Sequence, residues 1–253
     1  MDNNTKFNGK AKVYAAFRPH YPEQLLNDLF TECELSINST AADIGAGTGI
    51  LTKQLLDLGL TVFAVEPNED MRQAATGLLK DYKGITLVNG AAENTTLPEH
   101  SVDLVTAAQS FHWFNEEEFH KECQRILKKD GKVAIIANER VNEASVNLEI
   151  ADVYRRYCPN FNGFSNGLNG SQEIYDSFFN RNYHEIVYDY PLKYNKATFI
   201  GRHLSSSFAL QEGDKQYPML VEALAALFDK YGENGLLSIP NLTKCRYGVV
   251  QAK

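Results

Sequence analysis

The segment whose residue types and spacing most clearly suggest a ligand-binding site is Asp43 to Gly49, in which three glycines stand two residues apart. Glycine has no Cβ, so its backbone can take a positive φ and approach a ligand closely. Residues 50–58 have the apolar spacing of a helix, which places the turn at a helix N-terminus with free N–H groups. The third glycine comes one residue earlier than in the dinucleotide fingerprint G-x-G-x-x-G. We predict a turn that holds a nucleotide-like ligand, with a simple strand-to-helix turn as the alternative.

A carboxylate, Glu66, ends the next apolar segment, about twenty residues after the glycine turn. Ligands of open α/β sheets bind beyond the carboxyl ends of the strands, and a carboxylate at this place can accept hydrogen bonds from both hydroxyls of a ribose. We therefore expect Glu66 and Pro67 to face the ligand from an exposed strand end. A solvated loop acid is the alternative.

Aromatic side chains and one imidazole follow the fourth apolar segment, in Gln109-Ser110-Phe111-His112-Trp113-Phe114. Three interpretations of His112 stay open: a residue that positions a substrate, a general base, or a packed imidazole. Trp113 and Phe114 are expected to form a pocket wall.

Apolar segments alternate with segments of helical spacing from residue 40 to residue 138. This alternation predicts a doubly wound α/β fold, in which a mostly parallel sheet is covered on both faces. The expected strands are 41–44, 61–66, 85–88, 102–107, 132–137, 183–190 and 243–251, and the expected helices are 23–33, 50–58, 71–79, 116–127, 142–157 and 220–231.

The pattern acid-x-G-x-G-x-G at Asp43 to Gly49 resembles the first motif of class I S-adenosylmethionine-dependent methyltransferases. The resemblance covers residues 38–138 and implies a seven-stranded Rossmann-like sheet whose seventh strand is antiparallel. It also implies S-adenosylmethionine as the cofactor, S-adenosylhomocysteine as the product, and no metal. A carboxylate suits this cofactor, which carries an ammonium and a sulfonium and has no phosphate. The cofactor-binding residues that follow are Asp43, Gly45, Ala46, Gly47, Thr48, Gly49, Glu66, Pro67, Met71, Ala92, Glu93 and Gln109.

Residues 89–98 resemble the methyltransferase stretch in which an acidic side chain meets the adenine amino group and a backbone N–H meets the ring. Glu93 and Ala92 are the matching positions. Met71 is expected either to contact the adenine or ribose, or to be a core residue of its helix.

The pattern A-x-x-x-H-W-F at residues 108–114 resembles the branch of small-molecule methyltransferases that includes the trans-aconitate methyltransferases. R-P-x-Y-P at residues 18–22 and the segment 204–208 agree weakly with it. The resemblance implies in-line methyl transfer to a small, carboxylate-bearing acceptor, for which no base is required. His112 is the candidate catalytic residue, and the candidate substrate-binding residues are Tyr14, Arg18, Tyr21, Ser110, His112 and Trp113. Arginines that could pair with a carboxylate, or lie solvated on the surface, are Arg140, Arg155, Arg156 and Arg202.

We expect four parts along the chain: an N-terminal arm and helix (1–37), the cofactor-binding core (38–138), a cap insertion (139–182) and the last part of the core sheet (183–253). The arm at residues 14–21 is interpreted as a lid, with a packed surface arm as the alternative.

A net charge of −7 and a pI near 5.4 argue against a nucleic-acid partner, which would require a basic face. Four scattered cysteines without a C-x-x-C pair are typical of a reduced intracellular protein. The sequence begins without a basic start or an apolar run, so we expect a cytoplasmic protein that contacts no membrane. We expect it to be a monomer or a homodimer. The competing functions are a nicotinamide-dependent oxidoreductase with an altered glycine turn and a non-catalytic cofactor-binding regulator.

Overall fold

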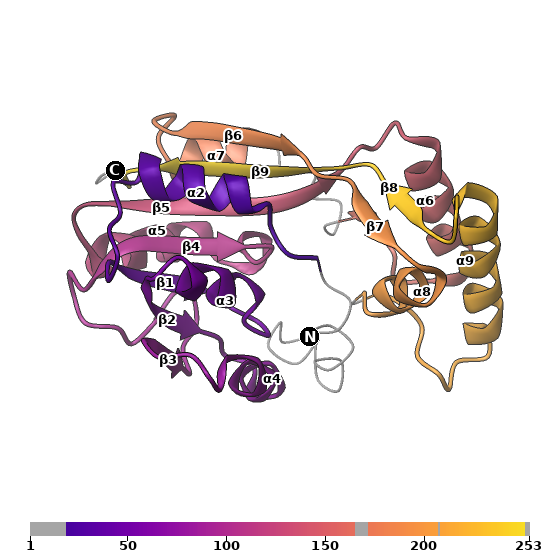
Figure 1. Ribbon diagram of the computed structural model, residues 1–253, viewed down its shortest axis with the longest axis horizontal. Coiled ribbons are helices and arrows are strands. Elements are labelled where there is room, and N and C mark those ends of the chain that lie inside the picture. Colours follow the sequence, from indigo (N-terminus) through magenta and orange to yellow (C-terminus); the bar gives the residue numbers. More distant parts are fainter. Residues whose placement is uncertain (1–18, 165–171, 207, 251–253) are drawn as a thin grey trace.

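The computed structural model describes residues 19–164, 172–206 and 208–250, which fold around a seven-stranded sheet (Figure 1). The strands are β1 (Thr40–Ile44), β2 (Thr61–Val65), β3 (Ile85–Val88), β4 (Val102–Ala108), β5 (Leu127–Arg140), β6 (His184–Asp189) and β9 (Asn241–Gly248). Their order is β3-β2-β1-β4-β5-β9-β6. Strands β1 to β5 are parallel, and β9 is antiparallel to both of its neighbours. The predicted Rossmann-like sheet with an antiparallel last strand is confirmed.

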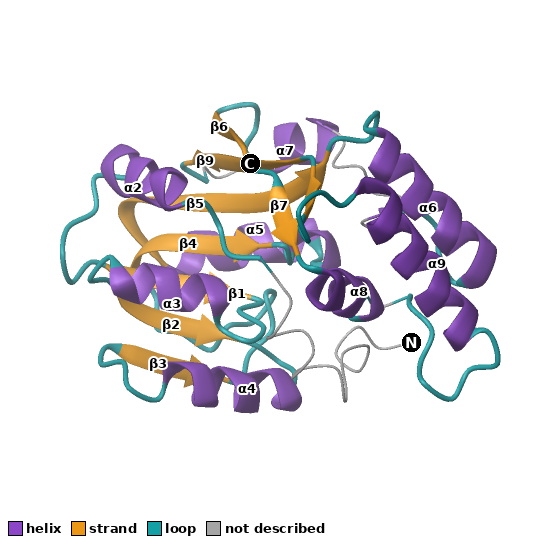
Figure 2. Cartoon of the chain, turned by 45° about the vertical axis from the view of Figure 1, so that its right-hand side comes forward, coloured by secondary structure: helices purple, strands orange, loops and turns teal. Residues whose placement is uncertain are grey.

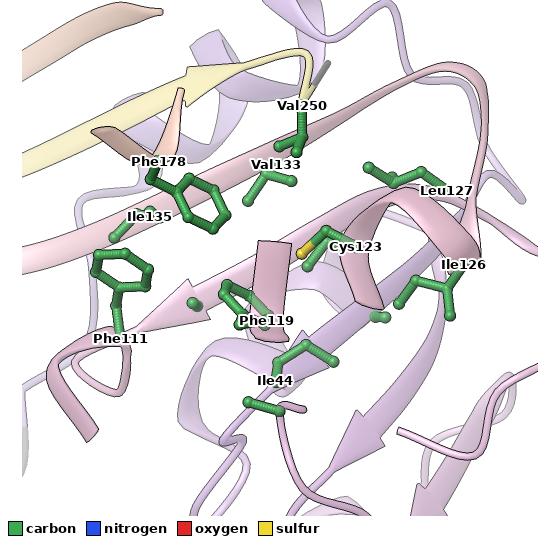
Figure 3. Close-up of a cluster of buried hydrophobic side chains, with 14 of the residues drawn as sticks. Ile44, Phe111, Phe119, Cys123, Ile126, Leu127, Val133, Ile135, Phe178 and Val250 are labelled. Carbon is green, nitrogen blue, oxygen red and sulfur yellow. The ribbon is translucent and has the colours of Figure 1, made fainter. Parts of the chain in front are cut away.

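Helices cover both faces of the sheet, which explains why its strands are apolar almost throughout. Helices α2 (Glu23–Glu32), α3 (Ile50–Asp57) and α4 (Glu69–Leu79) share one core cluster, and α5 (Glu116–Ile126) and α7 (Gln172–Phe178) share another. Successive strand residues point to opposite faces. On β5, Val133 and Ile135 therefore pack toward α5 and α7, while Ala134 and Ile136 pack toward α2 and α3. Figure 3 shows Val133 and Ile135 among the side chains of the α5 and α7 cluster.

Asparagine caps begin two of the helices that follow the carboxyl ends of the parallel strands. The side chain of Asn68 accepts a hydrogen bond from the backbone N–H of Met71 at the start of α4. Asn115 accepts one from Glu118 at the start of α5. Each cap satisfies a helix N–H that has no partner within the helix. The chain can therefore turn from a strand end into a helix within a few residues.

Strand β5 is longer at both ends than predicted. The sequence predicts a turn at residues 129–131, but the strand continues through them with Asp130 at φ 66° and a shift in the pairing with β4. A bulge of this kind absorbs a turn-forming residue without ending the strand. At its other end β5 runs on to Arg140, where it pairs with Asn241 of β9. This extension carries β5 out of the core and toward the cap.

The cap has a different composition from the one predicted. Helices α6 (Ser145–Tyr157), α8 (Lys196–Leu204) and α9 (Tyr217–Tyr231) surround a two-stranded sheet of β7 (Leu192–Tyr194) and β8 (Leu237–Ile239). Figures 1 and 2 show these elements together at one end of the molecule. The cap therefore takes four of these five elements from residues 192–240, which we assigned to the core sheet, while α7 leaves the expected cap and packs on α5. Helical spacing predicts that a segment buries one face, but it does not reveal which core receives that face.

The four cysteines are unbonded and buried, as their scatter in the sequence predicts. Burial raises the pKa of Cys33 to about 12 and that of Cys123 well above its ordinary value. Both therefore serve as small packing residues and have little thiolate character. Within the described ranges, no helix combines the length and the hydropathy that a membrane span requires.

Candidate functional site

Two adjoining cavities lie beyond the carboxyl ends of β1, β2 and β4, where the cap closes over the edge of the sheet. Their volumes are about 160 Å³ and about 130 Å³. Four residues belong to the walls of both: Gly45, Gly47, Gln109 and Trp113. A ligand longer than either cavity can therefore lie in both, alongside the glycine turn.

The three glycines of the turn have positive φ values of 67°, 57° and 85°, which explains their spacing. A Cβ on Gly45 would stand 2.6 Å from the Cβ of Ser110, and one on Gly49 would stand 3.0 Å from Cδ1 of Leu79. A Cβ on Gly47 would meet no described atom within 4 Å. Gly47 therefore opens the backbone to a ligand. Gly49, a predicted cofactor contact, instead packs against α4 and lies in neither cavity wall.

Ala46 and Thr48 line the larger cavity, as predicted for the turn. The side chain of Thr48 is 1% exposed, and its hydroxyl has no hydrogen-bond partner among the described residues. Leaving a buried hydroxyl without a partner costs about 1–3 kcal/mol. The hydroxyl of Thr48 therefore indicates a polar ligand group at this wall.

Asp43 lines the larger cavity, but its hydrogen bonds lie within the protein. The carboxylate accepts hydrogen bonds from the hydroxyls of Thr52, at 2.6 Å, and Thr106, at 3.1 Å, and it is 1% exposed. These bonds tie the first turn of α3 to β1 and β4. Burial raises the pKa of Asp43 to about 6 despite both hydroxyls. Direct contact between Asp43 and a cofactor stays a prediction.

Glu66 is 9% exposed and lines the smaller cavity with Pro67, so the expectation of an exposed strand end is wrong. Its two oxygens accept hydrogen bonds from the backbone N–H groups of Gly47 and Asn68, each at 2.9 Å. Burial raises the pKa of this carboxyl. The guanidinium of Arg72 donates to the carbonyls of Glu66 and Pro67 and so folds the loop inward. Glu66 therefore joins the glycine turn directly to the loop after β2.

Another wall of the smaller cavity is formed by residues that the methyltransferase resemblance assigns to adenine binding. Ala92 and Glu93 stand at the tip of a tight turn, and Met71 reaches the same cavity from α4. Met71 is 3% exposed and belongs to the buried residues of its helix. Met71 is therefore a core residue of its helix that also lines the smaller cavity, and its contact with the adenine or ribose stays a prediction.

The segment after β4 forms one wall of the larger cavity because Phe111 anchors it. The ring of Phe111 packs against Phe119 and Phe178, with centroids 6.1 Å and 5.2 Å away (Figure 3). Phe111 begins a short 3₁₀ helix, which brings His112 and Trp113 to the cavity with their rings 4.7 Å apart. Whether His112 positions a substrate or acts as a base stays open.

Gln109 and Ser110 come just before this helix and have different roles. Gln109 has a φ of 55°, and its side-chain amide donates to the carbonyl of Asn138 at 2.9 Å, so β5 fixes its position in both cavity walls. Ser110, a predicted substrate contact, donates its hydroxyl to the carbonyl of Ile44 at 2.8 Å. It lines only the smaller cavity. Ser110 therefore lies beside the smaller cavity, where it supports the turn at Gly45, and its contact with a substrate stays a prediction.

Two of the four candidate arginines line the larger cavity. Arg140 comes from the extension of β5, and its guanidinium lies 4.0 Å from the ring centroid of Phe164. Arg202 comes from α8, and its buried Nη1 has no hydrogen-bond partner among the described residues. Arg155 and Arg156 are exposed on α6, where Arg155 pairs with Asp152. The cap wall of the larger cavity is therefore cationic.

Sequence reasoning missed other polar residues of this wall, namely Asn138, Tyr194, His203, Ser206 and Asn241. The hydroxyl of Tyr154 lies 2.6 Å from Nδ1 of His203 and donates to the carbonyl of the same residue. This pair is buried between α6 and α8 and fixes the imidazole. The available signal was weak: only the match at residues 204–208 pointed to this part of the chain.

The predicted lid falls partly outside the described residues, which do not include Tyr14 or Arg18. Tyr21 is buried and lines the larger cavity. Its backbone exchanges two hydrogen bonds with the side chain of Gln54 on α3, at 3.1 Å and 2.9 Å. The end of the arm therefore lies beside the larger cavity, and lid closure stays a prediction.

Residues 42–135 match the family model of the methyltransferase domain. An uncharacterized methyltransferase of Schizosaccharomyces pombe is 37% identical over 130 residues, which cover 51% of this chain and 51% of that protein. An uncharacterized methyltransferase of Mycobacterium tuberculosis is 29% identical over 155 residues, 61% of each chain. The chain spans about half the length of the curated relatives that it matches first.

Solved structures of methyltransferase-like proteins share the fold. A candidate methyltransferase of an antibiotic biosynthesis pathway in Anabaena variabilis superposes with a TM-score of 0.63 at 25% identity, over 88% of this chain and 96% of that one. A candidate type II methyltransferase from Anaeromyxobacter dehalogenans gives a TM-score of 0.64 at 22% identity, over 94% and 100%. Residues 42–135 are therefore similar to a methyltransferase domain, and the chain has the Rossmann-like fold of these solved structures.

Proposed function

We propose that this protein transfers a methyl group from S-adenosylmethionine to a small-molecule acceptor that carries a carboxylate. One observation carries the proposal: two cavities share the glycine turn, and their other walls differ in chemistry. The smaller has carboxylates and an apolar floor, as a nucleoside requires, and the larger ends in two guanidinium groups. The fold class implies the cofactor, and its two-part shape fits a pair of connected cavities.

Residues of the core supply a site that fits this cofactor. We expect Glu66 to accept hydrogen bonds from the ribose hydroxyls. We expect Ala92 and Glu93, which line the same cavity, to contact the adenine. The unpartnered hydroxyl of Thr48 and the open backbone at Gly47 suit the polar groups of the amino-acid part. When bound, S-adenosylmethionine supplies a methyl group that its sulfonium makes electrophilic.

Residues of the cap supply the acceptor side. Arg140 and Arg202 can hold a carboxylate by charge-assisted hydrogen bonds. Trp113, Phe164 and Phe208 add apolar walls that exclude water. A carboxylate needs no base, so the protein contributes mainly by alignment, which can supply about 7–11 kcal/mol of a barrier. In this proposal His112 positions the acceptor.

Thermal unfolding with added ligand tests the cofactor. S-adenosylhomocysteine at one hundred times its dissociation constant should stabilise the fold by about 2.7 kcal/mol. For a chain of this size, that corresponds to a rise in melting temperature of roughly 5–10 °C. NAD and NADP, tested at the same concentration, should give no shift. Stabilisation by NAD alone would instead favour the nicotinamide-dependent oxidoreductase.

Mass spectrometry of a metabolite pool tests the acceptor. The purified protein with S-adenosylmethionine should add one methyl group to compounds that contain a carboxylate. A protein heated past its transition provides the control for non-enzymatic methylation. Methylation confined to compounds without a carboxylate would contradict the role given to Arg140 and Arg202.

A further inference from the structure

The adenine side of the site depends on a very short turn. Residues 91–94 form an isolated antiparallel bridge, in which Ala91 and Asn94 exchange backbone hydrogen bonds of 3.1 Å and 3.2 Å. Ala92 and Glu93 occupy its tip and line the smaller cavity. Such a turn has few contacts of its own, so its position must be set from outside.

Helix α5 grips this turn through a buried carboxylate. Glu122 is 7% exposed, and its Oε1 accepts hydrogen bonds from both the backbone N–H and the hydroxyl of Thr95, at 2.8 Å and 2.5 Å. Thr95 is fully buried and directly follows the turn. Burial disfavours the charge of Glu122, but hydrogen bonds from Arg125 and Thr95 more than offset it and lower the pKa of this carboxyl. An ionised acceptor therefore holds the end of the turn at neutral pH.

Arg125, one helical turn later on α5, adds a second contact between this helix and the segment after the turn. Its guanidinium donates to both oxygens of Glu122, at 2.8 Å and 2.7 Å, and to the carbonyl of Leu97 at 2.8 Å. At the start of the same helix, the backbone N–H of Asn115 donates to Oε1 of Glu93 at 2.8 Å. The segment from Glu93 to Leu97 is therefore attached to α5 at three points.

Glu122 itself lies in neither cavity wall. It reaches the site only through Thr95 and the turn. Because Asn115 holds one oxygen of Glu93, the direction of the other oxygen depends on where the turn sits. Resting on the proposed function, we propose that Glu122 is a positioning residue that sets the selectivity for the 6-amino group of the cofactor's adenine by holding the turn 91–94 against α5.

Two ligands that differ in the 6-amino group and in the adjoining ring N1, which is an acceptor in adenine and a donor in hypoxanthine, test the proposal. S-adenosylhomocysteine carries the 6-amino donor, and S-inosylhomocysteine carries a carbonyl in its place. Calorimetry should show that the wild-type protein binds the first at least about tenfold more tightly, since a hydrogen bond to a charged acceptor is lost with the second. In Glu122→Gln this ratio should fall by about tenfold, mostly through weaker binding of S-adenosylhomocysteine. Glu117→Gln removes the same charge from an exposed site on the same helix and should keep the wild-type ratio.

The outcomes separate the two proposals. If the wild-type protein binds neither ligand, the proposed function itself fails, and this inference fails with it. If the wild-type protein discriminates and Glu122→Gln discriminates equally well, Glu122 is structural and the inference is overturned, whatever the change in melting temperature. An equal loss of affinity for both ligands overturns it as well. Should Glu122→Gln not fold, Arg125→Lys keeps the charge at a site one-third exposed, breaks the two-point contact, and should lower the ratio in the same direction.

Discussion

The buried carboxylate of Asp43 offers a quantitative test of how the glycine turn is held, through the substitution Asp43→Asn. Asparagine has the same shape but no charge. It keeps one carbonyl oxygen for a hydroxyl donor, and the hydroxyls of Thr52 and Thr106 can rotate to accept from its amide. The exchange therefore removes a buried charge while most of the local hydrogen bonding survives.

The magnitude follows from the pKa of Asp43, which burial raises from 3.8 to about 6. A difference of about two pKa units is worth about 3 kcal/mol. Because the folded state binds this proton more tightly than the unfolded state, it holds more protons between about pH 4 and pH 6. The free energy of unfolding must therefore fall as the pH rises through this window, and the contribution is fully present only below it. At pH 8, after about 1 kcal/mol is subtracted for each weakened hydrogen bond, Asp43→Asn should be about 1 kcal/mol more stable than the wild-type protein.

Urea unfolding at pH 4, 5, 6 and 8 measures this directly. The difference in unfolding free energy between wild type and Asp43→Asn should change by about 3 kcal/mol across the series. Using the difference cancels the contributions of groups that do not interact with Asp43; the charge of Glu66 raises the pKa of Asp43, so part of the measured difference includes this coupling. If the two proteins show the same pH dependence and Asp43→Asn is less stable at pH 8, the carboxylate of Asp43 is not under electrostatic strain and the reasoning is refuted.

Three further substitutions, two of them paired with a comparison variant, test the site. Glu66→Gln should weaken binding of S-adenosylhomocysteine by about 1.5–3 kcal/mol. Because Glu66 is buried against two N–H groups, the substitution should also lower the unfolding free energy by about 1–3 kcal/mol. An unchanged dissociation constant in calorimetry would mean that the role of Glu66 is purely structural. Gly47→Ala should cost only about 1–2 kcal/mol of stability for its positive φ but should bind cofactor poorly, because the methyl group enters the cavity wall; Gly45→Ala, whose Cβ would collide with Ser110, should lose far more stability, and equal melting temperatures would contradict this. Arg202→Gln should raise the Michaelis constant for the acceptor by roughly tenfold or more with unchanged affinity for S-adenosylhomocysteine, while the exposed Arg155→Gln should match the wild-type protein in steady-state assays.

The core could be predicted from the sequence because its signals are local. Apolar spacing within one segment predicts the strand at 85–88 and the helix that begins at residue 50. The glycine turn is predicted because three closely spaced glycines indicate a backbone with positive φ values. The burial of Glu66 was not predictable in this way. It depends on the guanidinium of Arg72 and on the N–H of Gly47, which lies 19 residues before it, so a strand-end acid that should be solvated becomes a bridge.

The cap resisted prediction for a related reason. Helices α6 and α9 have clear apolar faces, but these faces meet each other although residues 158–216 separate the two helices in sequence. Helix α7, which lies between them in sequence, packs on the core. Nothing in the period of a helix specifies its partner. The same holds for the arginines. Arg155 and Arg156 also lie on a helix, α6, but they are exposed, and only the packing of α8 brings Arg202 to the cavity.

The larger cavity is lined partly by the core of the sheet and partly by the cap, and these two walls differ in whether they lie within the match to the methyltransferase domain. Its core wall comes from the glycine turn and the segment after β4, both within the 42–135 match to the methyltransferase domain. Its cap wall comes from residues 138–241, and there Arg140 stands on the part of β5 that runs past that match. The core wall therefore lies within the part of the chain that matches the methyltransferase domain, whereas the cap wall lies outside it. Two residues along a strand rise about 6–7 Å, so the backbone of Arg140 stands that far along β5 from Asn138, whose carbonyl accepts a hydrogen bond from Gln109. The extension of β5 past the matched domain therefore brings Arg140 into the wall of the larger cavity.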